Sequence, residues 1–230
     1  MERGRGFVAR RLTVPNRFAY LLSTVALLAT SCGGTDEPAG LDIDVVRNLT
    51  SEVPSGYKVE MFDSWSPNAG SGASNQDYSQ VFPERCESVL RARVTRAGEK
   101  DIVRGFNALS PDGDTLLSVQ AVKTDKPLDF EDIPQECRSV TFSTASAHGL
   151  ASVTEKPNVR AEYVQAIRSS TIDANSESGE GTNQYDYFAK VKGQILLHVI
   201  ISKPITLDDS LDPALGRQLF VKGAELLQGI

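Results

Sequence analysis

The sequence is poor in the residue types that most often carry metal and nucleophile chemistry. Its 230 residues include two histidines, three cysteines and one tryptophan. Protein zinc sites combine several closely spaced Cys and His ligands, and no such grouping occurs here. A Ser-His-Asp triad would have to use His148 or His198 as its base. We therefore expect no metal, no cofactor and no enzymatic activity.

Motifs for phosphate binding and acyl transfer are missing as well. No segment fits the G-x-x-x-x-G-K-[ST] phosphate loop, and no serine lies in a G-x-S-x-G context. His198 lies in an apolar run, which is typical of a hydrogen-bonded core histidine, and His148 precedes Gly149 and is interpreted as a turn residue. A carboxylate pair that cleaves glycosides stays open, because 30 acidic residues offer many pairs.

The N-terminus has the pattern of an export signal. Five arginines lie within residues 1–17, and an apolar run of about twelve residues follows to Ala29. That run is too short to span a bilayer. Small residues then precede Cys32, as in a bacterial lipobox, although Leu28 lies one position earlier than the usual leucine. We expect residues 1–31 to be a lipoprotein signal peptide and Cys32 to be diacylated. Cleavage by ordinary signal peptidase and an uncleaved anchor remain alternatives.

Removal of that signal changes the charge balance. The whole chain carries 24 Lys+Arg against 30 Asp+Glu, and the signal holds five of the positive charges and one of the negative, so residues 32–230 carry about −10. An acidic protein lacks the basic surface that nucleic acid and anionic lipid require. The expected membrane contact is through the acyl chains, at the extracytoplasmic face of the plasma membrane.

With Cys32 assigned to lipid, Cys86 and Cys137 form an even pair in an oxidising compartment. We expect a structural disulfide between them, worth roughly 4 kcal/mol for a loop of about fifty residues. Two free buried thiols or a metal pair are the alternatives, and neither cysteine has a nearby His or a CxxC spacing.

Residues 41–230 are interpreted as a single α+β domain, and residues 32–40 as a flexible tether. We expect a mostly antiparallel sheet flanked by N- and C-terminal helices. Helices are predicted over 41–53, over 83–93 and after Asp212, which caps the last one with Pro213 in its first position. Strands are predicted over 57–62, 102–109, 115–123, 137–143, 148–153, 158–169, 185–192 and 195–201.

Some positions in these elements carry more specific expectations. The run 195–201 is apolar on both faces, which predicts a central strand. Alternation over 185–192 predicts that Tyr187 points into the core and Asp186 into solvent. Gly216 and Gly223 weaken the last helix unless a neighbour packs closely against them.

Two long polar segments, 64–80 and 173–183, are predicted to be loops. The first contains Trp65 and Tyr78 and is flanked by Tyr57 and Phe62. These aromatic residues could line a ligand-binding groove, with Trp65 and Tyr78 as the candidate ligand contacts. Alternatively, Tyr57 and Phe62 belong to the core and Trp65 only anchors the loop.

A family resemblance rests on four features: the lipobox-like Cys32, the segment Val53 to Tyr57 (VPSGY), the Pro-x-x-Cys from Pro83 to Cys86, and a second cysteine, Cys137, in mid-domain. Together they resemble mycobacterial and related actinobacterial lipoproteins built on a domain of unknown function. That domain is similar in plan to the extracellular sensor domain of a mycobacterial Ser/Thr kinase. The resemblance implies an α+β domain, one disulfide and a ligand-binding or sensing role. Only the lipid-modified Cys32 and the pair Cys86–Cys137 carry over as functional residues.

We therefore expect a cell-envelope lipoprotein with a non-enzymatic ligand-binding or sensing domain, whose partner is an unidentified envelope ligand or protein. The alternatives are a carrier of an apolar envelope lipid and, less favoured, a hydrolase. The carrier requires a large apolar cavity between sheet and helices. The hydrolase requires His148 or His198 within hydrogen-bond reach of both a serine and an aspartate.

Overall fold

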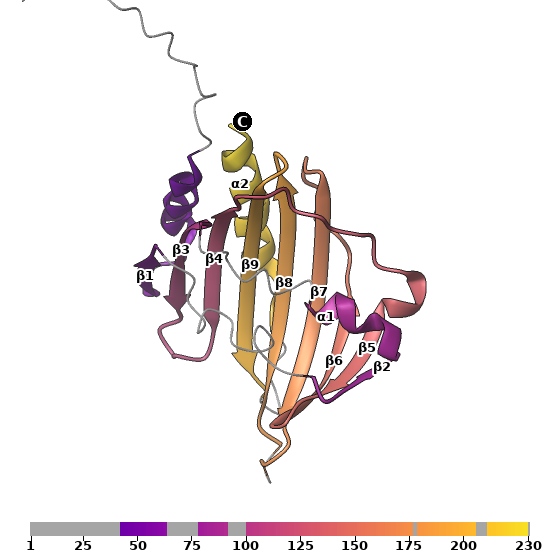
Figure 1. Cartoon of the computed structure of the whole chain (residues 1–230). Helices are drawn as coiled ribbons and strands as arrows, with labels where there is room; N and C mark the ends of the chain where they lie inside the picture. The colour runs from indigo at the N-terminus through magenta and orange to yellow at the C-terminus, as the bar shows by residue number, and fades with distance from the viewer. Residues whose placement is uncertain (1–41, 64–77, 92–99, 177–178, 206–210, 230) are drawn as a thin grey trace, which may run out of the picture. The chain divides into compact units, whose positions relative to one another are not determined.

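An antiparallel sheet forms the centre of the fold in the computed structural model, which describes residues 42–63, 78–91, 100–176, 179–205 and 211–229 (Figure 1). Within these ranges nine strands pair in the order β1-β3-β4-β9-β8-β7-β6-β5-β2. Their bounds are β1 Lys58–Phe62, β2 Gln80–Phe82, β3 Ile102–Leu109, β4 Leu116–Lys123, β5 Ser139–Ser143, β6 Ala147–Val153, β7 Tyr163–Asp173, β8 Gly181–Val191 and β9 Ile195–Pro204. The expected α+β domain with a mostly antiparallel sheet is confirmed.

The middle of the sheet is buried on both faces. Strand β9 lies between β4 and β8, and its residues from Ile195 to Ser202 are all buried. A strand that is covered on both sides must be apolar on both sides, which is why the run 195–201 lacks the alternation of its neighbours. The predicted central strand is confirmed.

One face of the sheet is covered by a 3-10 helix, η1 (Ile43–Glu52), and by the C-terminal helix α2 (Ala214–Gln228). The buried residues of η1 are Ile43, Val46 and Leu49. They recur every third residue, which matches the three residues per turn of a 3-10 helix and keeps them on one side. The helix predicted over 41–53 is therefore present, with 3-10 rather than α geometry.

Helix α2 lies directly against β9 because two of its residues have no side chain. A Cβ added at Gly216 would lie 2.8 Å from Ile201 Cγ2, and one at Gly223 would lie 3.2 Å from Leu197 Cδ2. The close neighbours that would justify these glycines are thus present. The Asp212 carboxylate accepts a hydrogen bond from the Ala214 amide at 2.9 Å, as expected of a capping residue. The helix begins at Ala214, however, and Pro213 is its N-cap rather than its first residue.

The opposite face carries short helical elements around the disulfide. They are η2 (Glu84–Cys86), α1 (Glu87–Arg91) and η3 (Gln135–Cys137), and α1 lies on the other side of the sheet from α2 (Figure 1). The Cys86–Cys137 bond joins η2 to η3 and confirms the predicted pairing. A second apolar cluster, which includes Val89, Leu90 and Leu196, packs around it.

Four further local predictions are wrong. Asp186 is buried rather than solvent-exposed, because the second face of β8 also lies inside the protein. His148 lies within strand β6 rather than in a turn, paired with Ser143 of β5. The strand predicted over 158–169 runs instead from Tyr163 to Asp173, and the loop predicted over 173–183 is shorter because β8 already begins at Gly181. In addition, strand β2 was not predicted, and it begins at Gln80, the last residue of the predicted loop 64–80.

The predicted signal peptide (1–31), the tether (32–40), Cys32 and Trp65 lie outside the described residues. No helix in the described ranges is long and apolar enough to cross a membrane.

Candidate functional site

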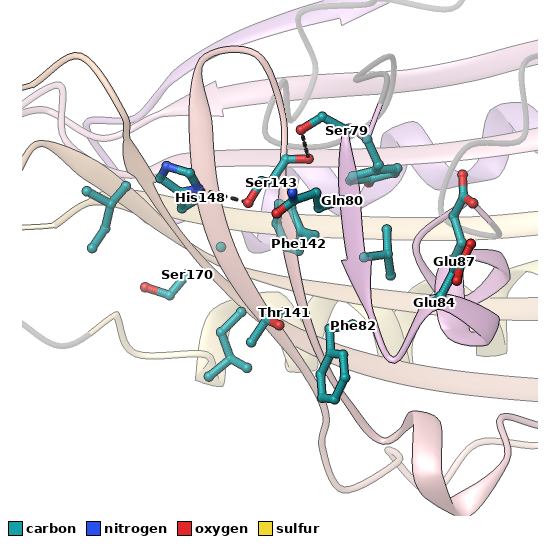
Figure 2. A pocket seen from close by; sticks show the side chains of 15 residues that line it. Ser79, Gln80, Phe82, Glu84, Glu87, Thr141, Phe142, Ser143, His148 and Ser170 are labelled. Atoms are coloured by element: carbon teal, nitrogen blue, oxygen red, sulfur yellow. Dashed lines mark hydrogen bonds between the residues drawn. The ribbon is translucent and has the colours of Figure 1, made fainter.

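An open cavity of about 920 Å³ lies at the β2 end of the sheet (Figure 2). We call it the edge cavity. Strands β2, β5, β6 and β7 supply most of its lining, and Glu84 and Glu87 contribute from the helical segment after β2. Helix α2 packs on β8 and β9, so the cavity begins where the helix no longer covers the sheet.

Eight of the lining residues share one sheet face and form two adjacent rows. Strand pairing aligns Phe82, Thr141, Leu150 and Ser170 in the first row, and Gln80, Ser143, His148 and Ile172 in the second. Residues two apart in a strand point to the same side, so both rows face the same way. This is also the face on which α2 packs, because Ser170 and Ile172 alternate in phase with the core residue Ala166.

The rows mix exposed apolar side chains with groups that form hydrogen bonds. Phe82 is 75%, Leu150 44% and Ile172 48% exposed, although apolar side chains of this size are normally buried in a soluble domain. Thr141 and Ser170 lie next to them in the first row. Clustered exposed apolar residues with polar neighbours are typical of binding surfaces.

Two aromatic residues of the cavity lining, Tyr78 and Phe142, also belong to the apolar cluster on the face opposite the two rows. The Tyr78 ring meets the Phe142 ring edge to face, with 5.4 Å between centroids. Phe142 in turn lies against Gly149, where an added Cβ would be 2.4 Å from the Phe142 ring. Tyr78, one of the two proposed ligand contacts, thus lines the edge cavity, while Tyr57 and Phe62 pack against the two core clusters, as the alternative interpretation predicted.

His148 and Ser143 form a hydrogen-bonded pair in the cavity. His148 Nδ1 lies 2.8 Å from Ser143 Oγ (Figure 2). Among the described ion pairs and hydrogen bonds of His148, none involves a carboxylate. The pair therefore has the hydroxyl and the base of a triad without the acid that orients the base.

His198 has the complementary half of a triad. Its Nε2 lies 3.3 Å from Asp186 Oδ1, and its Nδ1 lies 2.9 Å from Gln120 Nε2. Both ring nitrogens are therefore engaged, by a carboxylate and an amide rather than by a serine. The ring is also stacked on Phe188, with 4.2 Å between centroids. This confirms the predicted hydrogen-bonded core histidine.

The charge around the edge cavity is acidic. Glu84 and Glu87 belong to its lining, and no Lys or Arg does among the described residues. An anionic ligand would therefore be disfavoured by these carboxylates. The two rows themselves carry no carboxylate, which leaves them suited to neutral groups. The rows were not foreseen from the sequence, since they depend on which strands pair.

Comparisons with known proteins place the fold. A model for the family described as "Domain of unknown function (DUF5642)" matches residues 42–228. The structure of an uncharacterised protein from Mycobacterium smegmatis is 18% identical and has a TM-score of 0.65, covering 82% of this chain and 97% of that one. The extracellular domain of PknH from Mycobacterium tuberculosis is 8% identical with a TM-score of 0.42, covering 82% and 90%. No curated protein sequence matches significantly.

Proposed function

This chain belongs to the DUF5642 family, a domain of unknown function, and we propose that it is a lipid-anchored, extracytoplasmic binding protein of the cell envelope. Its edge cavity binds a neutral ligand that has both an apolar part and hydroxyl groups, and it does so without catalysing a reaction. The resemblance to a domain of unknown function, seen in the sequence, is confirmed by the family match.

The anchoring part of the proposal is supported by the N-terminal sequence and by the disulfide. A basic segment, a short apolar run and small residues lead up to Cys32. The Cys86–Cys137 bond fits an oxidising compartment. Diacylation of Cys32 would hold the domain at the membrane through two acyl chains, which is enough for stable attachment.

The single observation that carries the binding part is the pair of rows in the edge cavity. Opposite residues on neighbouring antiparallel strands have Cβ atoms about 5 Å apart. Thr141 lies opposite both Phe82 and Leu150 at this spacing, while Phe82 and Leu150 themselves lie two strands apart and Ile172 lies diagonally across from Leu150. Thr141, between Phe82 and Leu150, and Ser170, opposite Leu150 on the next strand, supply hydroxyl groups beside these apolar side chains. A ligand with apolar and hydroxylated faces satisfies both kinds of group at once.

The two histidines support a non-enzymatic role. His148 pairs with a serine and His198 with an aspartate, so each has one of the two partners that a triad requires. The two histidines also lie on different strands and on opposite faces of the sheet. His198 belongs to the face of Phe188, and His148 belongs to the edge-cavity rows. Neither histidine has both a serine and an aspartate within hydrogen-bond reach among the described residues. The condition set for a hydrolase is not met by either one.

The packing between α2 and the sheet does not favour the alternative function as a lipid carrier. Leu219, Phe220 and Leu227 are almost completely buried there. Gly216 and Gly223 bring the helix backbone within van der Waals reach of Ile201 and Leu197. Side chains therefore fill the layer in which an apolar lipid would have to lie.

Binding of phenyl β-D-glucoside to the full chain, held in nanodiscs of zwitterionic lipid, tests the proposal by saturation-transfer NMR. The probe has an aromatic ring and a neutral sugar. Phenyl β-D-glucuronide, which differs by a carboxylate, is its matched control and should bind more weakly because of Glu84 and Glu87. The variant Leu150→Thr/Ile172→Thr should bind the glucoside roughly fivefold or more weakly, since it removes two apolar contacts.

The variant Val59→Thr/Met61→Thr is the control for a general loss of exposed apolar surface. Val59 and Met61 are 38% and 49% exposed and lie in β1, the strand at the other edge of the sheet. This variant should bind the glucoside like the wild type. Equal binding by all three proteins, or no binding by the wild type, would overturn the edge-cavity assignment.

A further inference from the structure

We propose that a second cavity, distinct from the edge cavity, binds a planar organic cation. It has a volume of about 480 Å³ and lies between the segment 129–134, helix α1 and strands β7 and β8. We call it the loop cavity. Its floor residues Gln165, Ile167 and Phe188 belong to the sheet face opposite the edge-cavity rows.

Aromatic side chains give the loop cavity flat walls. Phe130 stacks on Tyr163 with 5.0 Å between centroids and 12° between planes. Phe188, at the floor, is stacked on His198, which fixes the plane of its ring. Rigid rings with fixed orientation favour a ligand that is itself planar and can lie against them.

The floor also holds a polar group without a partner. Gln165 is 4% exposed, and Tyr163 donates its hydroxyl hydrogen to Gln165 Oε1 at 2.9 Å. Gln165 Nε2, at the other end of the amide, is buried and has no hydrogen-bond partner. A buried amide nitrogen that lacks a hydrogen-bond partner destabilises the folded protein. A ligand with a carbonyl, ether or hydroxyl oxygen at its inner end would accept this hydrogen bond and remove that destabilisation.

Burial raises the pKa of Tyr163, and the nearby Asp132 carboxylate raises it further. The hydroxyl therefore keeps its hydrogen at neutral pH and continues to donate to Gln165 Oε1. This holds the amide in one orientation, with its nitrogen end free for the ligand.

The mouth of the loop cavity is acidic. Three acidic residues, Asp129, Glu131 and Asp132, belong to the cavity lining. Among the described lining residues, Arg85 is the only basic one. Arg85 is paired with Glu136 at 3.4 Å, outside the cavity lining. Among the described residues neither Asp129 nor Glu131 has an ion pair, whereas Asp132 is paired with Lys156 at 3.8 Å. A positive charge at the outer end of the ligand would be attracted by the carboxylates of Asp129 and Glu131.

The disulfide holds the two sides of the cavity together. Cys86 lies between Arg85 and Val89 on one side, and Cys137 follows Pro134 on the other. The walls are therefore cross-linked close to the ligand position. A preformed cavity costs less conformational entropy when it is filled.

Berberine, a planar cation with ether oxygens whose fluorescence rises in apolar surroundings, is a suitable probe for the full chain in zwitterionic nanodiscs. We expect it to bind the wild type and to bind Gln165→Leu roughly three- to tenfold more weakly, the effect of one lost hydrogen bond. Asp129→Asn/Glu131→Gln should weaken binding roughly fivefold or more at low salt, and less at high salt. The control Glu60→Gln/Glu225→Gln removes the same charge from exposed positions outside the cavity and should bind like the wild type.

No binding of berberine to the wild type, or equal binding by the cavity variants and the control, would overturn the proposal. Phenyl β-D-glucoside should not displace berberine, because the two cavities share no lining residue. Displacement would contradict the assignment of two separate sites. Failure of the edge-cavity proposal alone would leave the berberine results unchanged, so the two proposals are tested separately.

Discussion

Asp186 Oδ1 lies 3.3 Å from His198 Nε2 across the central strands β8 and β9. Gln184 Nε2 donates to both oxygens of the same carboxylate, at 2.8 and 2.9 Å. On the other side of the ring, Gln120 Nε2 lies 2.9 Å from His198 Nδ1. His198 thus connects three neighbouring strands, β4, β9 and β8, through buried polar contacts, and its removal would leave a carboxylate and an amide without these partners.

We expect His198→Ala to lower the free energy of unfolding by roughly 3 kcal/mol or more, because it creates a cavity and removes one hydrogen bond each from the buried Asp186 and Gln120. The matched change His148→Ala removes an exposed histidine and should cost less than about 1 kcal/mol. Urea unfolding of both variants checks this. Similar midpoints for the two variants would contradict the structural role given to His198.

Loss of the Cys86–Cys137 bond should destabilise the domain by about 2–4 kcal/mol, since the unfolded chain regains the freedom of a long loop. Cys86→Ala/Cys137→Ala should therefore unfold at lower urea than Cys32→Ser, which keeps the bond. Addition of dithiothreitol should lower the midpoint of Cys32→Ser and leave that of the double variant unchanged. A reductant effect of equal size on both would show that the bond is not the source of the difference.

The two glycines of α2 should respond differently to alanine. Alanine gains about 1 kcal/mol of helix propensity at either position. At Gly216 the new Cβ would clash with Ile201 at 2.8 Å, and we expect a net loss of roughly 1–2 kcal/mol. At Gly223 the contacts are 3.2 Å, to the ends of Leu197 and Leu49, which can adjust, so we expect a change close to zero. Thermal unfolding of the two variants measures the difference, and the reverse order would refute the packing described.

Stability should fall at high pH because of Tyr187. Burial is the main cause that raises the pKa of Tyr187 from 10.0 to about 12. In the unfolded chain the hydroxyl ionises near its ordinary pKa of about 10. The contribution of the neutral hydroxyl is thus complete below pH 10 and is lost as the pH rises from 10 towards 12. Tyr187→Phe should show a shallower decline of the free energy of unfolding over this window, and an identical slope would contradict the role of Tyr187.

Much of the fold could be predicted from periodicity, because the pattern of apolar residues reports which side of an element is buried. The double-sided apolar run of β9 and the Pro-flanked C-terminal helix are examples. Asp186 could not be placed correctly by the same reasoning. Alternation in β8 distinguishes two faces but does not tell whether the polar face is covered, and here that face carries the contact with His198.

The edge cavity shows a different limit. Its rows join Phe82 of β2 to Ser170 of β7, which are 88 positions apart in the sequence and are brought into line by three successive strand pairings. No local pattern records those pairings. Tyr78 was found because aromatic residues in a polar segment are conspicuous, whereas Leu150 and Ile172 look like ordinary strand residues until their exposure is known.

The most direct measurement is native mass spectrometry of the full protein purified from its own membrane. The account predicts the mass of residues 32–230 increased by diacylation at Cys32. It also predicts a bound neutral ligand on the wild type. The ligand should persist in Val59→Thr/Met61→Thr and disappear from Leu150→Thr/Ile172→Thr. An unacylated Cys32 or a ligand retained equally by both variants would contradict a lipid-anchored protein that binds through its edge cavity.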